Sequence, residues 1–255
     1  MARRPPPGKC VHCLKDGVER TWDHVFPESW YPETTGADIE KWKIPACQPC
    51  NKVYGVLEQD LMIRIGLCID RAAFESAGVV PKVLRSLNPK LAKNPRDRRA
   101  REAKRDQILK QVLKGTDIPL SAVYPRFGER WGRPPEHQVA VPLPKKSVDR
   151  LFEKIIRGFA YLEDGRFIEP PHTVALYPLG ENDAPVFTSL LDKFGKVYAR
   201  GPGIVVRRAV TPEDGLSAIY EITIWGAFQT YAVVLGDEPN PSLTANAREQ
   251  STRAS

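Results

Sequence analysis

The residues best suited to chemistry lie within the first fifty-one positions. Asp23 and His24 are neighbours in the segment Thr-Trp-Asp-His-Val-Phe-Pro. They place a hard-metal ligand beside the side chain whose unperturbed pKa lies nearest neutrality. One Cys-x-x-Cys pair precedes them, and a second follows and is succeeded directly by Asn51. The four cysteines are Cys10, Cys13, Cys47 and Cys50.

The two cysteine pairs match the ligand count of a closed structural zinc site. Four thiolates leave the metal no open position, so this zinc is expected to stabilise the fold and not to catalyse. In a reducing compartment such spacings indicate metal ligands rather than disulfides. The spacing alone also fits a zinc-ribbon binding module. His12, inside the first pair, is expected to face solvent, and Cys68 to be a small core hydrophobe.

The order Cys-x-x-Cys, Asp-His-Val-Phe-Pro, Cys-x-x-Cys-Asn closely resembles HNH endonucleases of the zinc-stapled ββα-metal type. The resemblance covers roughly residues 9–60. It implies that His24 is the general base that deprotonates a water, and that Asp23 binds one catalytic divalent ion, Mg²⁺ or Mn²⁺. Asn51 matches the last motif position and would be the second protein ligand of that ion.

The sequence departs from this family in one place. HNH domains usually carry an asparagine shortly before the second cysteine pair, where it orients the base, and residues 41–46 contain none. A backbone carbonyl could orient the imidazole instead, or the site could be weak or inactive. Because successive strand residues face opposite ways, Asp23 and His24 can share a site only through a bend or bulge. Glu58, seven residues after Asn51 on the same helical face, could assist the metal or pair with a basic residue.

Composition bounds the class of protein. With 255 residues and 42% hydrophobic residues, the chain is long and apolar enough for a real core. Its start lacks the apolar core of a signal peptide, and no apolar run approaches membrane-spanning length. We therefore expect a cytoplasmic protein with no membrane partner.

The net charge of +7 is concentrated in one segment, because residues 90–114 hold ten Lys or Arg and three acids. Residues 96–114 predict a charged helix that ends at Gly115, with Arg98, Arg101 and Arg105 along one face. These arginines are the expected contacts to a nucleic-acid backbone. A solvated helix face is the alternative. Further basic groups without a motif are Lys154, Arg157, Arg166, Arg207 and Arg208.

Periodicity predicts the elements that position these residues. We expect a strand near 18–26, a helix near 52–76, a short helix over 81–87, and a helix that has Ser147 as its N-cap. Strands are expected at 173–177, 204–210, 218–225 and 230–235, with a helix near 184–194. The predicted class is α+β, with an N-terminal zinc-stapled ββα-metal (HNH) module, a helical linker and a C-terminal α+β domain whose sheet is mainly antiparallel.

The expected division of the chain is a disordered arm (1–8), the HNH module with its following helix (9–78), a basic helical linker (79–118), an α+β recognition or assembly domain (119–236) and a disordered tail (237–255). The leading functional hypothesis is a metal-dependent endonuclease that hydrolyses phosphodiester bonds in DNA. The alternative is a non-catalytic, zinc-dependent nucleic-acid-binding or regulatory protein on an HNH scaffold.

Overall fold

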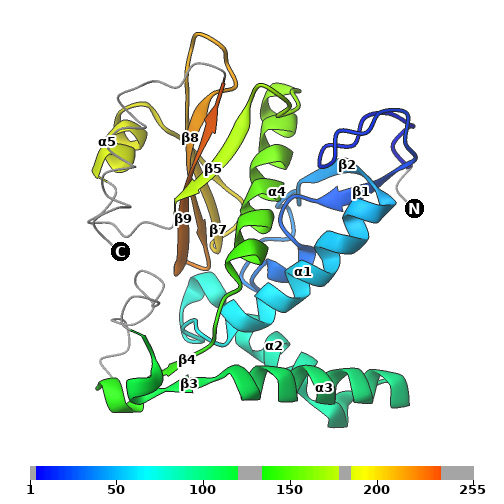
Figure 1. The fold of residues 1–255 in the computed structure, drawn as a ribbon, viewed down its shortest axis with the longest axis vertical. Helices are drawn as coiled ribbons and strands as arrows, with labels where there is room; N and C mark the ends of the chain where they lie inside the picture. Colours follow the sequence, from blue (N-terminus) through cyan, green and yellow to red (C-terminus); the bar gives the residue numbers. More distant parts are fainter. Residues whose placement is uncertain (1–3, 120–133, 178–184, 237–255) are drawn as a thin grey trace.

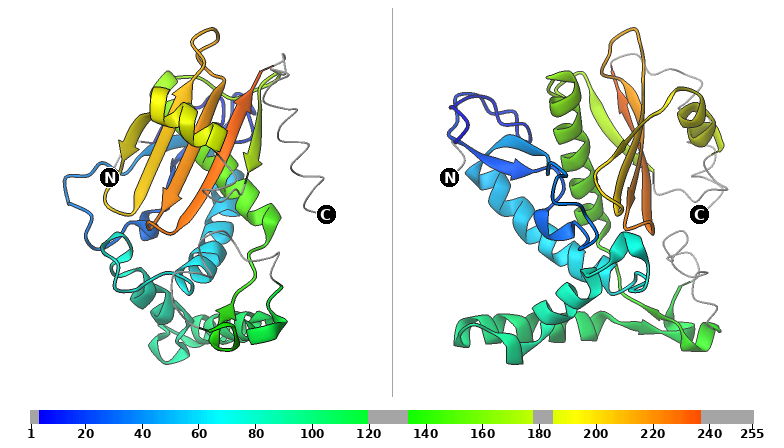
Figure 2. Two further views of the ribbon diagram at one scale, coloured as in Figure 1. Left: turned by 90° about the vertical axis from the view of Figure 1, so that its left-hand side faces the viewer. Right: turned by 180° about the vertical axis from the view of Figure 1, so that it is seen from behind.

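The computed structural model describes residues 4–119, 134–177 and 185–236, and the fold is α+β (Figure 1). A small N-terminal unit of two strands and a helix lies on one side of helix α4 (Lys145–Asp164). A five-stranded antiparallel sheet lies on the other side, and the same order is seen from behind in Figure 2. Helix α4 thus lies between the N-terminal unit and the C-terminal sheet.

The N-terminal unit is a ββα arrangement. Strand β1 (Arg20–His24) pairs antiparallel with β2 (Lys43–Cys47), and helix α1 (Gln48–Gly66) begins immediately after β2. The residue pattern predicts no separate strand over β2, although the ββα resemblance implies a second strand, and β2 contains Pro45. In a two-stranded sheet every strand is an edge, so the missing N–H of Pro45 is tolerated. Pro49 likewise fits the first turn of α1, where the N–H would have no helical partner.

The predicted helix over 52–76 is wrong at its end, because α1 stops at Gly66. A Cβ on Gly66 would lie 2.7 Å from Val83 Cγ2, so this glycine lets helix α2 (Val79–Leu87) pack closely against α1. Buried Ile69 continues the apolar pattern into a non-helical turn. The chain then passes through the short 3-10 helix η2 (Phe74–Ser76).

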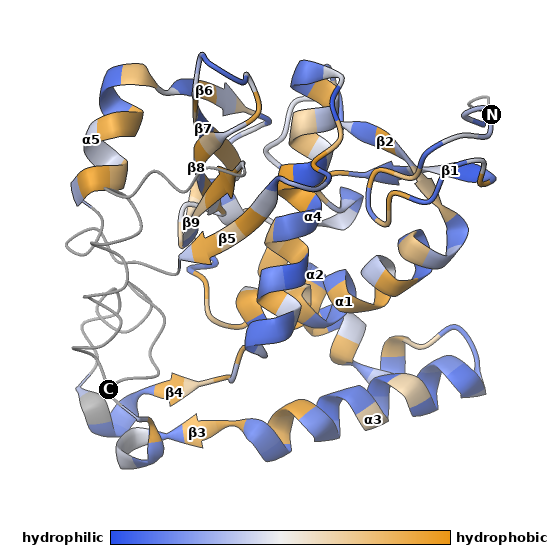
Figure 3. Ribbon diagram, turned by 45° about the horizontal axis from the view of Figure 1, so that its top comes forward, coloured by the Kyte–Doolittle hydropathy of each residue, from blue (hydrophilic) through white to orange (hydrophobic). Residues whose placement is uncertain are grey.

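Helix α3 (Pro95–Gln111) carries most of the basic segment and runs across one end of the molecule. Asn94 caps it by accepting a hydrogen bond from Asp97 N. The predicted end at Gly115 is wrong, because Leu113–Lys114 leave the helix as β3 and pair with β4 (Val139–Ala140). Most of α3 is hydrophilic in Figure 3, and Ile108 is its buried residue.

The C-terminal sheet confirms the predicted antiparallel arrangement. Its strands are β5 (Thr173–Tyr177), β6 (Lys196–Ala199), β7 (Ile204–Val210), β8 (Ala218–Ile224) and β9 (Phe228–Leu235), in the order β5-β9-β8-β7-β6. Helix α4 covers one face and α5 (Pro185–Phe194) the other (Figure 1). Strand β6 was not predicted.

One continuous hydrophobic core connects the ββα unit to the sheet. Gly158 of α4 fits tightly against β2 and the chain after β1, since a Cβ there would lie 2.9 Å from Val25 Cγ2 and 3.0 Å from Ile44 Cδ1. Phe159, one residue further, lies edge-on to Trp42 with ring centroids 5.2 Å apart. The ββα unit is therefore held in a fixed position against α4. Among the helices of the described ranges, none has the length and apolar character needed to cross a membrane.

The predictions for the two ends of the chain concern, in part, residues that the structure does not describe. The expected tail (237–255) lies outside the described residues, as do residues 1–3 of the expected arm. Within the rest of the arm, Gly8 forms an isolated bridge with Val18, and Pro6 O accepts a hydrogen bond of 2.7 Å from Arg20 Nε. Residues 6–8 therefore pack beside β1.

Candidate functional site

The four paired cysteines come together at the base of the ββα unit. Their sulfur atoms all lie within 4.8 Å of one another. Cys10 and Cys13 lie in a turn before β1, Cys47 ends β2, and Cys50 lies in the first turn of α1. The Cys13 and Cys47 sulfurs are 3.8 Å apart. A tetrahedral site with Zn–S bonds of about 2.3 Å gives nearly this sulfur separation. The donor set therefore fits zinc.

The environment of these sulfurs also suits a shared cation. Burial raises the pKa of the Cys10 thiol, but backbone N–H groups, including that of Cys47 at 3.2 Å, outweigh this and lower it. Burial and the neighbouring sulfurs raise the pKa of the Cys47 and Cys50 thiols. Neighbouring thiolates repel one another, so each ionised thiol makes ionisation of the next less favourable. A bound divalent ion offsets this repulsion.

Asp23 is buried one residue before the end of β1, and both of its oxygens have partners. Oδ2 lies 2.9 Å from His12 Nε2, and Oδ1 accepts a hydrogen bond of 3.2 Å from Lys154 Nζ. Burial raises the pKa of the Asp23 carboxyl, but the His12 hydrogen bond and the Lys154 charge together lower it, so the carboxylate is ionised at neutral pH. The expectation that His12 faces solvent is wrong: it is buried, with its ring 4.7 Å from that of Tyr54.

Lys154 is a residue of this site whose part sequence reasoning missed, since the sequence indicated only a further basic group. It is fully buried on α4 and is no surface contact for nucleic acid. Its ammonium donates to His24 O at 2.7 Å, to Asp23 Oδ1 at 3.2 Å and to Glu58 Oε1. Three acceptors match the three donors of an ammonium group. The available signal was its position on the apolar stripe of α4, three residues after Leu151 and four before Gly158.

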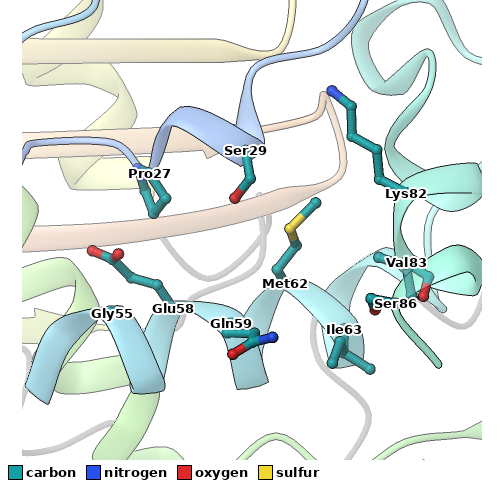
Figure 4. Close-up of a pocket in the computed structure, with 10 residues that line it drawn as sticks. All are labelled: Pro27, Ser29, Gly55, Glu58, Gln59, Met62, Ile63, Lys82, Val83 and Ser86. Atoms are coloured by element: carbon teal, nitrogen blue, oxygen red, sulfur yellow. Dashed lines mark hydrogen bonds between the residues drawn. The ribbon is translucent and has the colours of Figure 1, made fainter. Parts of the chain in front are cut away.

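Glu58, on α1, pairs with Lys154, which is one of the two roles expected for it. Burial raises the pKa of its carboxyl to about 7 even though the Lys154 ammonium opposes that rise. The side chain also borders a pocket of about 410 Å³ between α1, α2 and the chain after β1 (Figure 4). Pro27 and Ser29 line the same pocket opposite α1, and Lys82 lines it from α2.

His24 is the last residue of β1 and is half-buried. Burial lowers the pKa of its imidazole, and the nearby Lys43 ammonium lowers it further against the opposing effect of Glu28. The imidazole is therefore neutral at pH 7, as a proton acceptor must be. The β1–β2 ladder runs without interruption to His24, so the bend expected near Asp23 is not found within the strand. Regular alternation then directs the Asp23 and His24 side chains to opposite faces.

Asn51 reaches β1 but contacts it before Asp23. Its side-chain nitrogen donates to Thr21 Oγ1 and to Trp22 O, each at 3.2 Å. These bonds fix the start of α1 against the strand. Within the described residues, no hydrogen bond joins Asn51 to Asp23. The side chains of Asp23, His24 and Asn51 thus belong to one small unit, but they do not converge on a common site.

Both oxygens of the carboxylate expected to hold a second, hydrolytic ion are therefore already engaged. With Lys154 in place, Asp23 offers no free oxygen, and Glu58 shares the same ammonium. Over the ranges that the structure describes, the four cysteines form the one group of three or more His, Cys, Asp or Glu residues close enough to hold a metal. As arranged, the donor set fits zinc and does not fit a second ion.

The three arginines expected to contact nucleic acid differ in their surroundings. Arg98 is exposed on α3. Arg101 is half-buried, pairs with Asp97 at 3.0 Å and donates to the backbone carbonyl of Arg85, so it holds α3 against α2. Arg105 contacts Asp106 at 3.0 Å. Arg98 is therefore the clearest of the three as a surface cation.

Comparison with known proteins adds no relative to these observations: no family model, no curated protein and no solved structure matches the chain.

Proposed function

We propose that the protein is a zinc-stapled endonuclease of the HNH type that hydrolyses phosphodiester bonds, with DNA as the expected substrate. The observation that carries this proposal is the ββα unit itself. A four-cysteine cluster lies at its base, and a neutral imidazole, His24, lies at the end of β1. The order of these features along the chain is the order that the HNH resemblance implies.

In this proposal His24 acts as the general base. Its neutral imidazole accepts the proton of a water that attacks the phosphorus atom. Asn51 keeps β1 against the start of α1, and the zinc cluster anchors the same two elements. A Mg²⁺ or Mn²⁺ ion, when bound, would supply charge stabilisation for the phosphate oxygens. The Asp23 carboxylate that the resemblance assigns to this ion is held by His12 and Lys154, so the arrangement described does not fit the ion.

Nucleic acid would be bound mainly through its phosphates. Helix α3 presents Arg98 to solvent on a helix in which basic residues outnumber acidic ones. Such contacts position a polyanion without reading its sequence. Lys154 and Arg208 are excluded from this surface because both are buried, and Arg208 pairs with Asp164.

A plasmid assay tests the proposal. Zinc-loaded wild type is incubated with supercoiled DNA and Mn²⁺ or Mg²⁺, beside a His24→Ala variant that retains its zinc. We expect nicking by the wild type and at least a hundredfold slower nicking by the variant, since a positioned base contributes about 10²–10⁴-fold. Equal rates for the two proteins would contradict the role of His24.

A second function is favoured by one observation, which is that Lys154 and His12 occupy both oxygens of Asp23. A protein that keeps this arrangement permanently would bind nucleic acid without cutting it. The same experiment separates the two functions. Retardation of DNA on a gel, with both proteins leaving it intact under every ion, would establish the binding function.

A further inference from the structure

Arg200, which directly follows β6, is half-buried, and its guanidinium lies over the ring of Trp42 at 4.0 Å from the centroid. Within the described part of the chain it has no carboxylate or carbonyl acceptor. A guanidinium drawn partly out of water is usually paired with such an acceptor. Every other described arginine that is buried or half-buried donates to one, namely Arg20, Arg64, Arg101, Arg105, Arg157, Arg207 and Arg208.

Two hydroxyl groups near Arg200 are buried and likewise have no hydrogen-bond partner over the described ranges. They belong to Thr35 and Tyr31. A Cβ on Gly201, the next residue along the chain, would lie 3.0 Å from Thr35 Oγ1. Burial raises the pKa of Tyr31 to about 12, although the nearby Arg200 charge lowers it, so the phenol keeps its proton. A positive charge beside two such hydroxyl groups favours an anion.

The same region borders the proposed general base. Trp42 O accepts a hydrogen bond of 3.0 Å from the backbone N–H of Val25, the residue after His24. Trp42 also immediately precedes Lys43, which is exposed and lies opposite His24 in the β1–β2 ladder. Arg200 and Lys43 therefore place two positive charges close to the end of β1 that carries the imidazole.

The backbone fixes the position of Arg200. Its N–H donates to Ile204 O at 2.9 Å, which closes the turn between β6 and β7. Gly203 O, in the same turn, accepts a hydrogen bond of 2.6 Å from Trp225 N. The guanidinium therefore projects from a constrained turn onto the ββα unit, as a preformed binding group requires.

We propose that Arg200 binds a phosphate of the nucleic-acid backbone near the scissile one, so that the C-terminal sheet forms part of the substrate site. This proposal rests on the proposed function and adds to it a contact from outside the ββα unit. A guanidinium can donate two parallel hydrogen bonds to phosphate oxygens. Stacking on Trp42 restrains the side chain before it binds. Glu28, an acid of the same region, is engaged by Lys41 at 2.9 Å.

The test measures the affinity of zinc-loaded protein for a short, fluorescently labelled DNA duplex by anisotropy, without added divalent ions. Arg200→Met removes the charge and keeps an apolar side chain over Trp42. We expect at least about fivefold weaker binding at low salt, and a slope of log affinity against log salt that is smaller by about 0.9, the share of one phosphate contact. Arg200→Lys should restore the slope and only part of the affinity, because an ammonium lacks the planar fork.

Arg166→Met is the matched control. It also removes one positive charge from an exposed side chain, but Arg166 contacts Asp214, beyond the other end of β7. We expect this variant to bind DNA as wild type does. Thermal melting and zinc content are measured for every protein. If Arg200→Met does not fold, Arg200→Gln, which also lacks the charge and can still donate hydrogen bonds, takes its place.

Unchanged affinity and salt slope in the folded uncharged variant would overturn the proposal. Binding of inorganic phosphate that depends on Arg200, with DNA affinity independent of it, would also overturn it by assigning the site to a free anion. The outcome is separable from that of the nuclease assay. Weaker DNA binding by Arg200→Met, with no cleavage by any of the proteins, would sustain the phosphate contact and reject the endonuclease. Cleavage by wild type, with wild-type DNA affinity in Arg200→Met, would do the reverse.

Discussion

Trp225 and Trp30 join the two ends of the chain. The Trp225 indole N–H donates to the Trp30 carbonyl at 2.7 Å, the two ring centroids are 5.0 Å apart, and both side chains are buried. Trp225 directly follows β8 of the sheet. Trp30 follows β1 and is the last residue of the short 3-10 helix η1 (Glu28–Trp30). This contact and the packing of α4 make the N-terminal unit part of a common core.

Loss of that hydrogen bond is expected to weaken the whole protein. Trp225→Phe keeps an aromatic ring but leaves the buried Trp30 carbonyl without this donor, at a cost of about 1–3 kcal/mol in the free energy of unfolding. Because the core is shared, far-UV circular dichroism and tryptophan fluorescence should report one coincident urea transition. Trp22→Phe, at a 41% exposed position, is the control, with a change within about 0.5 kcal/mol. Two separate transitions in the wild type would contradict a common core.

Zinc is expected to be required for the ββα unit. Cys47→Ser removes one thiolate from the cluster, and structural zinc contributes about 10–16 kcal/mol of binding free energy that is also folding free energy. The variant should lose zinc and become sensitive to protease between β1 and α1. Cys68→Ala, outside the cluster, should retain one zinc per chain by mass spectrometry. Full zinc content in Cys47→Ser would show that the four sulfurs do not act as one site.

Much of this fold was predictable because local patterns determine it. The bounds of β5 and β7 follow from their β-branched and aromatic residues, and the apolar stripe predicts most of α4. The end of α1 was not predictable from periodicity, since it depends on the approach of α2 at Gly66. The two Cys-x-x-Cys pairs correctly predicted the cluster of four cysteines. The surroundings of Asp23 were predicted only in part. Motif spacing identifies Asp23, but it cannot show that Lys154, which is distant in the sequence, contacts it in the fold.

The raised pKa of Glu58 predicts a pH dependence of stability. Its carboxyl has a pKa of about 7 in the folded protein, against an ordinary value of 4.5. Between these values the folded state retains a proton that the unfolded chain has released. The contribution of Glu58 to stability is therefore complete below pH 4.5 and is lost as the pH rises to 7, by as much as about 3 kcal/mol.

Glu58→Gln removes this contribution. Urea unfolding at pH 5 and at pH 7, without added divalent ions, should show that the wild type loses more stability than the variant on going to pH 7. Asp23, which lies near Glu58, and the histidines His12 and His24 also titrate in both proteins. The quantity to compare is therefore the difference between wild type and variant. An identical pH dependence in the two proteins would assign Glu58 an ordinary pKa.

Surface charge on α3 should control affinity for DNA. Arg98→Glu reverses an exposed charge, so we expect weaker binding and a smaller slope of log affinity against log salt, by about one to two phosphate contacts. Arg101→Glu should also destabilise the protein, because Arg101 pairs with Asp97 and holds α3 to α2. Arg71→Glu makes the same charge change at an exposed position outside α3. Equal effects of Arg98→Glu and Arg71→Glu would indicate that α3 has no special part in binding.

The distance along the chain between Glu58 and Lys154 has a consequence for biosynthesis. The ribosome makes the two acids first, and the lysine follows 96 positions after Glu58. At rates of about 5–20 residues per second, this leaves an interval of roughly 5–20 s in which the nascent ββα unit has its carboxylates and lacks its own ammonium. Until α4 has been made and packed against the unit, the arrangement in which both acids contact one buried ammonium cannot form.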